Sequence, residues 1–356
     1  MTEMNQLFTG NLFIFHAYDV GDDISLEQIK DEQLLIRRPL HLSKYFKDYH
    51  TPLEVDLPHP HTSSRVWSSK LHGFGVITLT YKIPFSQTLN ELKEEINSVD
   101  NEYNEQSVVD AGSLYNKIKT AIKTPKFFHL RTTYFLIQVD PIAGIDTEKL
   151  KEEFGGMIAT ILRFEIDALS EYQKNEILES SVGYYRGNLI VIDTGAAFIY
   201  EDDYEEILDL FEFANLQHLE LQYFDRILAH QLNTVYERGI QKVPLQSFLP
   251  FMNTLANDPI AALGKLKVDI SVITERLENS IKLAGEQYYS DIYALLIEKL
   301  DIRNWQASIN RKLNIIIDLR SVYEKKVDNV REDLLSVLII VLIFIEMIVG
   351  ILHLFK

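Results

Sequence analysis

The stretch that decides the fold is residues 334–355, LLSVLIIVLIFIEMIVGILHLF, which contains only two ionisable side chains, Glu346 and His353. At about 1.5 Å per residue, a helix of this length reaches about 33 Å, enough to cross a hydrocarbon core of about 30 Å. The alternative is a helix buried all round in a soluble core, but such a helix normally carries polar residues on its outer face. The stretch therefore predicts one C-terminal transmembrane helix.

Basic residues flank this apolar run unevenly. Only Lys356 follows it, whereas four precede it: Arg320, Lys325, Lys326 and Arg331. Positive residues favour the cytoplasmic side, so we expect residues 1–333 to lie there. The opening MTEMNQLFTG lacks the basic region and the following apolar region of a signal peptide, and it is too acidic for a transit peptide. The expected location is the inner (cytoplasmic) membrane, crossed once, or the matrix side of the inner membrane for a mitochondrial member.

The composition narrows the function classes. The formal net charge is −17, which argues against a nucleic-acid binder, because phosphate contacts need clustered Lys and Arg. The chain has no Cys, so disulfides, catalytic thiolates and Cys-ligated metals are excluded. Its hydrophobic content of 46% suffices for a globular core. No cofactor is expected.

Residues 1–202 predict an α+β head. Apolar runs suited to strands occur at 12–18, 73–81, 132–139, 188–193 and 196–200. Helical patterns lie between them, at 86–123 with an interruption near 98–104, and from Asp146 or Thr147 to about 177. Asp22 and Asp23 are expected to cap a short helix, and Pro84 is expected to end the second strand.

Residues 203–333 predict an all-α helical stalk, with helices at 204–238, 246–256 and 259–285 and a last one at 289–355 that runs into the membrane. The last helix shows a heptad-like seam of apolar residues: Ile302, Ile309, Leu313, Ile316, Tyr323, Val327 and Val330. Such a seam needs a partner helix. Helix 204–238 of the same chain and a helix of another subunit are equally compatible with the pattern.

A basic segment follows the acidic helix of the head. No Asp or Glu occurs from Ala111 to Val139, where five basic residues stand: Lys117, Lys119, Lys123, Lys126 and Arg131. On an anchored protein this patch could rest on anionic lipid, each residue contributing about 1 kcal/mol. The alternative is a solvated face that pairs with the acidic helix before it.

Two sequence features invite a catalytic or metal-binding interpretation. Asp193-Thr194-Gly195-Ala196 resembles an aspartic-protease loop, but that chemistry needs two such carboxylates, so a hairpin turn is favoured. His59 and His61 lie in a cluster of five His between positions 41 and 72 and are weak candidates for zinc or copper ligands. No phosphate-binding, nucleophile-elbow or zinc-protease motif occurs, and no catalytic residue is predicted.

Glu346 is the most informative ionisable residue. A carboxyl group at mid-bilayer is costly unless it is protonated or paired, so we expect it to face protein. Small, polar and apolar residues continue one helical stripe through it: Ser336, Ile339, Ile343, Glu346, Gly350 and His353. Gly permits close helix approach and Glu can hydrogen-bond across an interface, so the stripe predicts a contact between copies of the chain. A proton pathway is less favoured, because one carboxylate does not make a relay.

Several segments together resemble the "required for meiotic nuclear division" family. They are NLIVID at 188–193, LFEFANLQHLELQYFDRILAHQL at 210–232, Trp305 followed by SINRKLNIIIDL, and LIIVLIFIEMI around Glu346. The resemblance implies membrane association and self-association into large complexes, with support of organelle translation in mitochondrial members. It implies no catalytic residues. Because no presequence is seen, a prokaryotic member is expected, for which a link to ribosomes is in doubt.

The sequence therefore predicts a membrane-anchored, self-associating scaffold or assembly protein without catalytic activity, whose partners are itself, the lipid bilayer and an unidentified protein. The alternative is a membrane-tethered enzyme or ligand-binding head. A channel is disfavoured, because polar residues that could line a pore are few.

Overall fold

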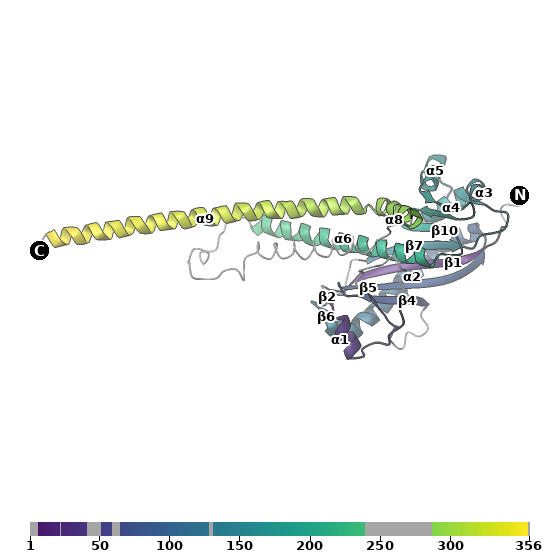
Figure 1. Cartoon of the computed structure of the whole chain (residues 1–356), viewed down its shortest axis with the longest axis horizontal. Helices are drawn as coiled ribbons and strands as arrows, with labels where there is room; N and C mark the ends of the chain where they lie inside the picture. The colour runs from purple at the N-terminus through teal and green to yellow at the C-terminus, as the bar shows by residue number, and fades with distance from the viewer. Residues whose placement is uncertain are drawn as a thin grey trace. The chain divides into compact units, whose positions relative to one another are not determined.

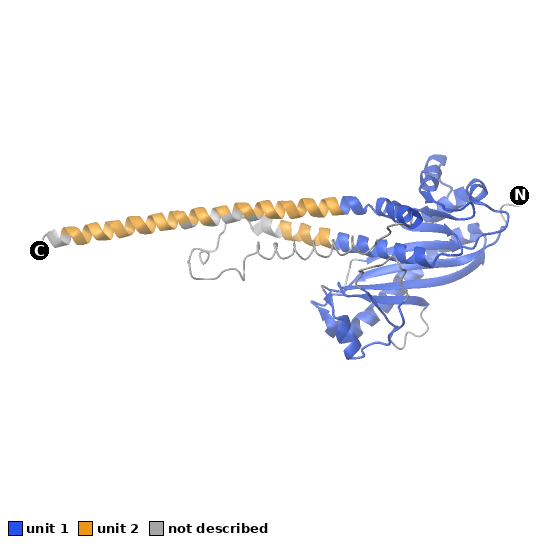
Figure 2. Ribbon diagram, viewed as in Figure 1, with its two compact units in different colours: residues 1–223, 273–305 blue, residues 224–272, 306–356 orange. Residues whose placement is uncertain are grey.

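The computed structural model describes residues 6–21, 23–40, 51–58, 65–127, 131–238 and 287–354. The chain divides into two compact units (Figure 2): unit 1 is residues 1–223 with 273–305, and unit 2 is residues 224–272 with 306–356. Two long helices, α6 (Glu205–Arg238) and α9 (Ile302–Leu354), contribute to both units. The two units divide α6 after Tyr223 and α9 after Trp305. The boundaries expected from the sequence, at 202 and 333, stay predictions.

Unit 1 is built on an eight-stranded sheet with the order β3-β4-β5-β1-β7-β10-β9-β8 (Figure 1). Its strands are β1 (Phe8–Asp19), β3 (Leu53–Glu54), β4 (Val66–His72), β5 (Val76–Gln87), β7 (Arg131–Val139), β8 (Ser181–Val182), β9 (Leu189–Ile192) and β10 (Ala196–Tyr200). Neighbouring strands are antiparallel except for β7 and β10, which are parallel. The connection between these two, residues 140–195, contains helices followed by β8 and β9. A second sheet pairs β2 (Asp23–Ile24) with β6 (Ile122–Lys123).

The two faces of the large sheet are covered differently. On one face, β1 contributes Leu12, Ile14 and Tyr18 to the main apolar core, which also holds residues of α2 (Leu89–Ile118) and α4 (Gly155–Leu162). On the other face, Ala17 packs with Leu216 and Leu219 of α6. Because successive side chains of a strand point to opposite sides, both faces of the central strands are buried.

Shorter helices complete unit 1: α1 (Leu26–Asp31), a 3-10 turn (Lys119–Ala121), α3 (Thr147–Lys149) running into a π-helical turn (Leu150–Phe154), α5 (Glu171–Glu179) and α8 (Gln287–Lys299). Their starts follow local hydrogen bonding. Ser25 caps α1, and a reciprocal capping box between Thr88 and Glu91 starts α2.

Four local expectations were wrong. Gly73–Gly75 form a turn between β4 and β5 instead of opening a strand, helped by the positive φ of +98° at Gly75. Pro84 does not end β5, because it lies past the last residue that β4 pairs and so interrupts no second ladder. Helix α2 is continuous, and Ser25 instead of Asp22 or Asp23 caps α1.

The helices after residue 146 and residue 288 are also interrupted. The first ends at Leu162, followed by Phe164 with a φ of +56°, and resumes as α5 at Glu171. The second is divided between α8 and α9 by Asp301, whose φ is also +56°. The predicted class is confirmed: a sheet-containing α+β region, several helices and one C-terminal apolar helix.

Candidate functional site

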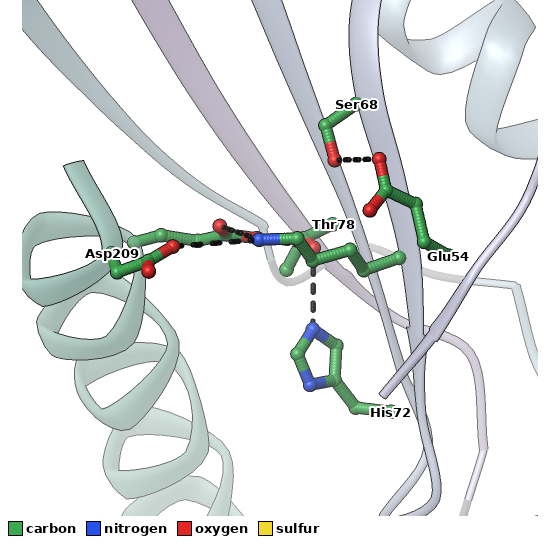
Figure 3. A network of polar contacts seen from close by, with 7 residues as sticks. Glu54, Ser68, His72, Thr78 and Asp209 are labelled. Carbon is green, nitrogen blue, oxygen red and sulfur yellow. Dashed lines mark hydrogen bonds and ion pairs between the residues drawn. The ribbon is translucent and has the colours of Figure 1, made fainter. Parts of the chain in front are cut away.

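A polar network lies on the α6 side of the sheet (Figure 3). Lys70 of β4 points to that side, and its Nζ is 2.6 Å from Oε2 of Glu212 and 3.9 Å from Oδ1 of Asp209, both on α6. Lys70 and Glu212 are buried, with 7% and 9% of their surfaces exposed. Charged residues are rarely this buried unless they are paired, and here the pair joins a strand to a helix.

The network continues along β5 and β4. Thr78 Oγ1 donates to Oε1 of Glu212 at 2.8 Å, and Nε2 of His72 lies 3.2 Å from the same hydroxyl. Because the Thr78 hydroxyl donates its only proton to Glu212, it can only accept from His72, so Nε2 of His72 is assigned as the donor. At the sheet edge, Ser68 donates to Glu54 at 3.1 Å. The two carboxylate oxygens of Glu212 thus accept from different residues, Oε1 from Thr78 and Oε2 from Lys70.

Burial and charge set the protonation states. Burial alone would lower the pKa of Lys70, but the carboxylates of Glu212 and Asp209 outweigh it and raise the pKa above its usual value. Burial would raise the pKa of Glu212, but the Lys70 ammonium outweighs it and lowers the pKa. For His72, burial dominates and lowers the pKa to about 3. At neutral pH Lys70 is thus an ammonium, Glu212 a carboxylate and His72 a neutral imidazole.

This arrangement is suited to holding α6 on the sheet. The Lys70 amine is protonated and enclosed, so it is not available as a nucleophile or base. The sequence analysis missed the network. A signal was present in the alternation Ser68, Lys70, His72 along one strand face and in the placement of Glu212 between two phenylalanines, but either pattern also fits a solvated surface.

Asp193 occupies the hairpin between β9 and β10, as favoured from the sequence. Its backbone N–H donates to Ala196 O at 2.9 Å, and Tyr134 Oη donates to its carbonyl at 2.6 Å. The buried carboxylate lies 2.5 Å from Nε of Arg163, without hydrogen-bond geometry to the described residues. This carboxylate is thus paired with a guanidinium, whereas aspartic-protease chemistry needs a second carboxylate.

The predicted metal ligands His59 and His61 lie outside the described residues. Within the described ranges, no group of three or more His, Asp or Glu side chains is arranged to hold a metal ion.

The predicted seam of α9 is partly buried. Ile302, Ile309, Leu313 and Ile316 have 4% or less of their surfaces exposed and Val330 is half-buried, whereas the side chains of Tyr323 and Val327 lie outside the described residues. Within unit 2, Lys312 Nζ is 2.6 Å from Oδ1 of Asp225 on α6, and Ser308 donates to the same oxygen at 2.7 Å. In this stretch α9 packs on α6 of the same chain.

The predicted basic patch is exposed at all five positions: Lys117, Lys119, Lys123, Lys126 and Arg131. Lys123 pairs with Asp23 at 3.4 Å, and Lys119 lies 5.8 Å from the ring centre of Tyr115. These contacts leave the charges at the surface, so a role against lipid stays a prediction.

The apolar end of α9 is unlike the rest of the chain. Segment Asp328–Ile351 is long and apolar enough to cross a membrane, with a mean hydropathy of 3.0, and none of it is buried. Its large apolar side chains from Leu334 to Ile351 are 41–65% exposed. The predicted stripe of Ser336, Ile339, Ile343, Glu346 and Gly350 is exposed with it, and the side chain of His353 is not described.

Comparison with known proteins gives a family but no activity. Residues 9–206 match the family model described as "Uncharacterized protein MJ0711, N-terminal domain". A search of curated proteins finds "Uncharacterized protein MJ0711" of Methanocaldococcus jannaschii, 24% identical over 207 residues, which cover 58% of this chain and 62% of the archaeal one. No solved structure matches. Neither description mentions meiotic nuclear division, so that resemblance stays a prediction.

Proposed function

The chain belongs to the family of the MJ0711 N-terminal domain, whose matched region ends at residue 206, and we propose that it is a membrane-anchored scaffold that self-associates through the apolar part of α9. The archaeal relative is aligned over 62% of its length, so any activity of that whole protein carries over only as a proposal. The matched region covers the α+β sheet, and the anchor lies beyond it.

The observation that carries the proposal is the exposed apolar segment of α9. Soluble proteins rarely expose contiguous apolar patches larger than a few hundred Å², because such patches are driven to associate. Here a whole helical segment, 0% buried and with a mean hydropathy of 3.0, has no apolar cover among the described residues. A bilayer supplies that cover on all sides of a helix, since every backbone group is already hydrogen-bonded within it.

Basic residues before the segment favour an orientation with unit 1 in the cytoplasm. Lys325 is exposed on α9, one turn before Asp328, and positive charge near the end of a span favours the cytoplasmic side. The inner (cytoplasmic) membrane is the proposed location.

Glu346 supports the proposed self-association. A carboxylate at the centre of a membrane helix costs about 3 kcal/mol on insertion scales. Glu346 and Ile343 are exposed, and a Cβ added at Gly350 would meet no described atom within 4 Å. A second copy can cover this stripe, hydrogen-bond the carboxyl group and approach closely at Gly350.

Anchoring is tested by extracting membranes that contain the full chain with alkaline carbonate. Leu342→Arg places a charge in the apolar segment, so we expect it to lower the retained fraction several-fold. Ile317→Arg is the matched control, an exposed apolar position of the same helix outside the segment, and it should leave retention unchanged. Equal retention of wild type and Leu342→Arg would contradict anchoring by α9.

Self-association is tested by light scattering in detergent. We expect Glu346→Leu to lower the particle mass toward that of one chain and Glu346→Gln to preserve it, because an amide still hydrogen-bonds across helices. A wild-type mass equal to one chain, or an unchanged mass in Glu346→Leu, would reject the contact.

A further inference from the structure

A second surface, in unit 1, carries exposed aromatic side chains. Tyr184 and Tyr185, in the loop between β8 and β9, are 62% and 71% exposed. Their backbone N–H groups donate to Oδ1 of Asn188 at 3.0 and 2.6 Å, and Asn188 is itself buried. These bonds restrain the backbone of the loop with both tyrosines exposed, which lowers the backbone entropy lost when they bind a partner.

A third ring and a carboxylate adjoin these tyrosines. The ring centre of Tyr184 is 4.7 Å from that of Tyr185 and 5.8 Å from that of Tyr288 on α8. Tyr288 Oη donates to Oε2 of Glu201 at 2.6 Å, and Asn188 Nδ2 donates to Oε1 at 3.3 Å. Glu201 is half-buried and held at this position by both bonds.

We propose that this tyrosine cluster, Tyr184, Tyr185 and Tyr288 with Glu201, binds an arginine side chain of a basic protein partner. Aromatic faces attract cations, and a planar guanidinium stacks on them while its N–H groups reach a carboxylate. Each oxygen of Glu201 accepts one bond and keeps a lone pair, so the carboxylate can accept from a ligand.

Charge around the cluster fits a basic partner. The exposed acids Asp202 and Asp203 follow Glu201 directly and outnumber the one exposed cation of the tyrosine loop, Arg186, and the whole chain has a formal net charge of −17. Such a field raises the rate at which a basic segment arrives, and the rings select arginine once it is there. The inference is independent of whether α9 crosses a membrane.

Fluorescence anisotropy tests the proposal on the full chain in detergent, at physiological ionic strength. The probes are labelled peptides of alternating arginine and glycine, or of alternating lysine and glycine. We expect the arginine peptide to bind several-fold more tightly than the lysine peptide. The double variant Tyr184→Ala/Tyr185→Ala should weaken arginine-peptide binding by about ten-fold, because two stacking faces are lost.

Matched variants separate this site from general attraction to an acidic protein. Tyr172→Ala removes a tyrosine that is 79% exposed outside the cluster and should leave the affinity unchanged. Tyr184→Phe/Tyr185→Phe keeps both faces and should keep binding, which also controls for folding of the loop. Glu201→Gln should weaken binding more than Asp202→Asn.

Three results would overturn the proposal. The first is equal weakening in the Tyr172→Ala control, and the second is equal affinity for the arginine and lysine peptides. The third is that phosphocholine displaces the arginine peptide and binds the cluster more tightly than the peptide does. That result would indicate a quaternary ammonium as the ligand instead of arginine.

Discussion

Replacing Glu212 with glutamine tests the view that the buried ion pair holds α6 on the sheet. The substitution keeps the shape of the side chain and its acceptor for Thr78, but it removes the carboxylate 2.6 Å from Lys70 Nζ. The ammonium is then left in a buried position, with Oδ1 of Asp209 3.9 Å away. The Glu212 carboxylate no longer compensates for the cost of removing the Lys70 ammonium from water, so we expect unit 1 to lose stability.

The expected loss is large compared with that of a surface pair. Removing one partner of a buried ion pair typically costs about 3–5 kcal/mol. For a unit of this size each kcal/mol shifts the melting temperature by about 2–4 °C, which gives a fall of roughly 6 °C or more. The surface pair of Lys149 and Glu153, 3.8 Å apart and part-exposed, provides the control, since Glu153→Gln should cost less than about 0.5 kcal/mol.

Thermal unfolding in detergent, followed by near-ultraviolet circular dichroism, measures both variants. A further double variant, Lys70→Met with Glu212→Leu, should regain most of the lost stability, because no charge is then left buried. The reasoning is refuted if Glu212→Gln melts with the wild type, or if the double variant is less stable than Glu212→Gln alone.

Two further predictions concern histidine protonation and a close backbone contact. Burial lowers the pKa of His16 and of His72 to about 3, whereas an unfolded histidine has a pKa of about 6.5. As the pH falls from 6.5 to 5.5, only the unfolded chain binds protons at these two positions. Each histidine should therefore lower the free energy of unfolding by about 1 kcal/mol over that range. Urea unfolding at several pH values checks this, and His16→Gln should flatten the slope; a slope equal to that of the wild type would contradict it. Gly10→Ala should lower the free energy of unfolding by about 3 kcal/mol, because its Cβ would lie 2.0 Å from Gln138 O. Gly187→Ala, whose Cβ would meet no atom within 4 Å, should be near neutral in the same urea assay. Similar losses in both variants would contradict this explanation.

The features predicted well from the sequence are those fixed by local patterns. The run at 196–200 is apolar on both faces and the run at 132–139 is mostly apolar, which is typical of central strands, and they form β10 and β7. The apolar run from residue 334 is helical without a break, as its composition requires. Errors occurred where tertiary structure overrides a local signal. Strand β5 tolerates Pro84 because β4, its neighbour on one side, has ended by this position, so the missing N–H interrupts no hydrogen bond to β4.

The polar network could not be predicted because it depends on residues far apart in sequence. Lys70 and Glu212 are separated by 142 positions, and only the packing of α6 on the sheet makes them neighbours. A lysine in a strand and a glutamate in a helix are each ordinary at a solvated surface. The tyrosine cluster was not predicted either, because the adjacent tyrosines between Gly183 and Arg186 do not show that Tyr288, about 100 positions later, joins them.

The network also defines the position of α6 along the sheet. Apolar contacts alone would tolerate a slide of one turn, because Leu208, Phe211 and Leu216 are interchangeable as buried side chains. A slide of four residues would place Leu208 or Leu216 where Glu212 lies, so Lys70 would lose the carboxylate 2.6 Å from its ammonium. In the first case Glu205 would take the place of Asp209, and in the second Phe213 would take it. The ion pair therefore favours the observed register of α6 on the sheet.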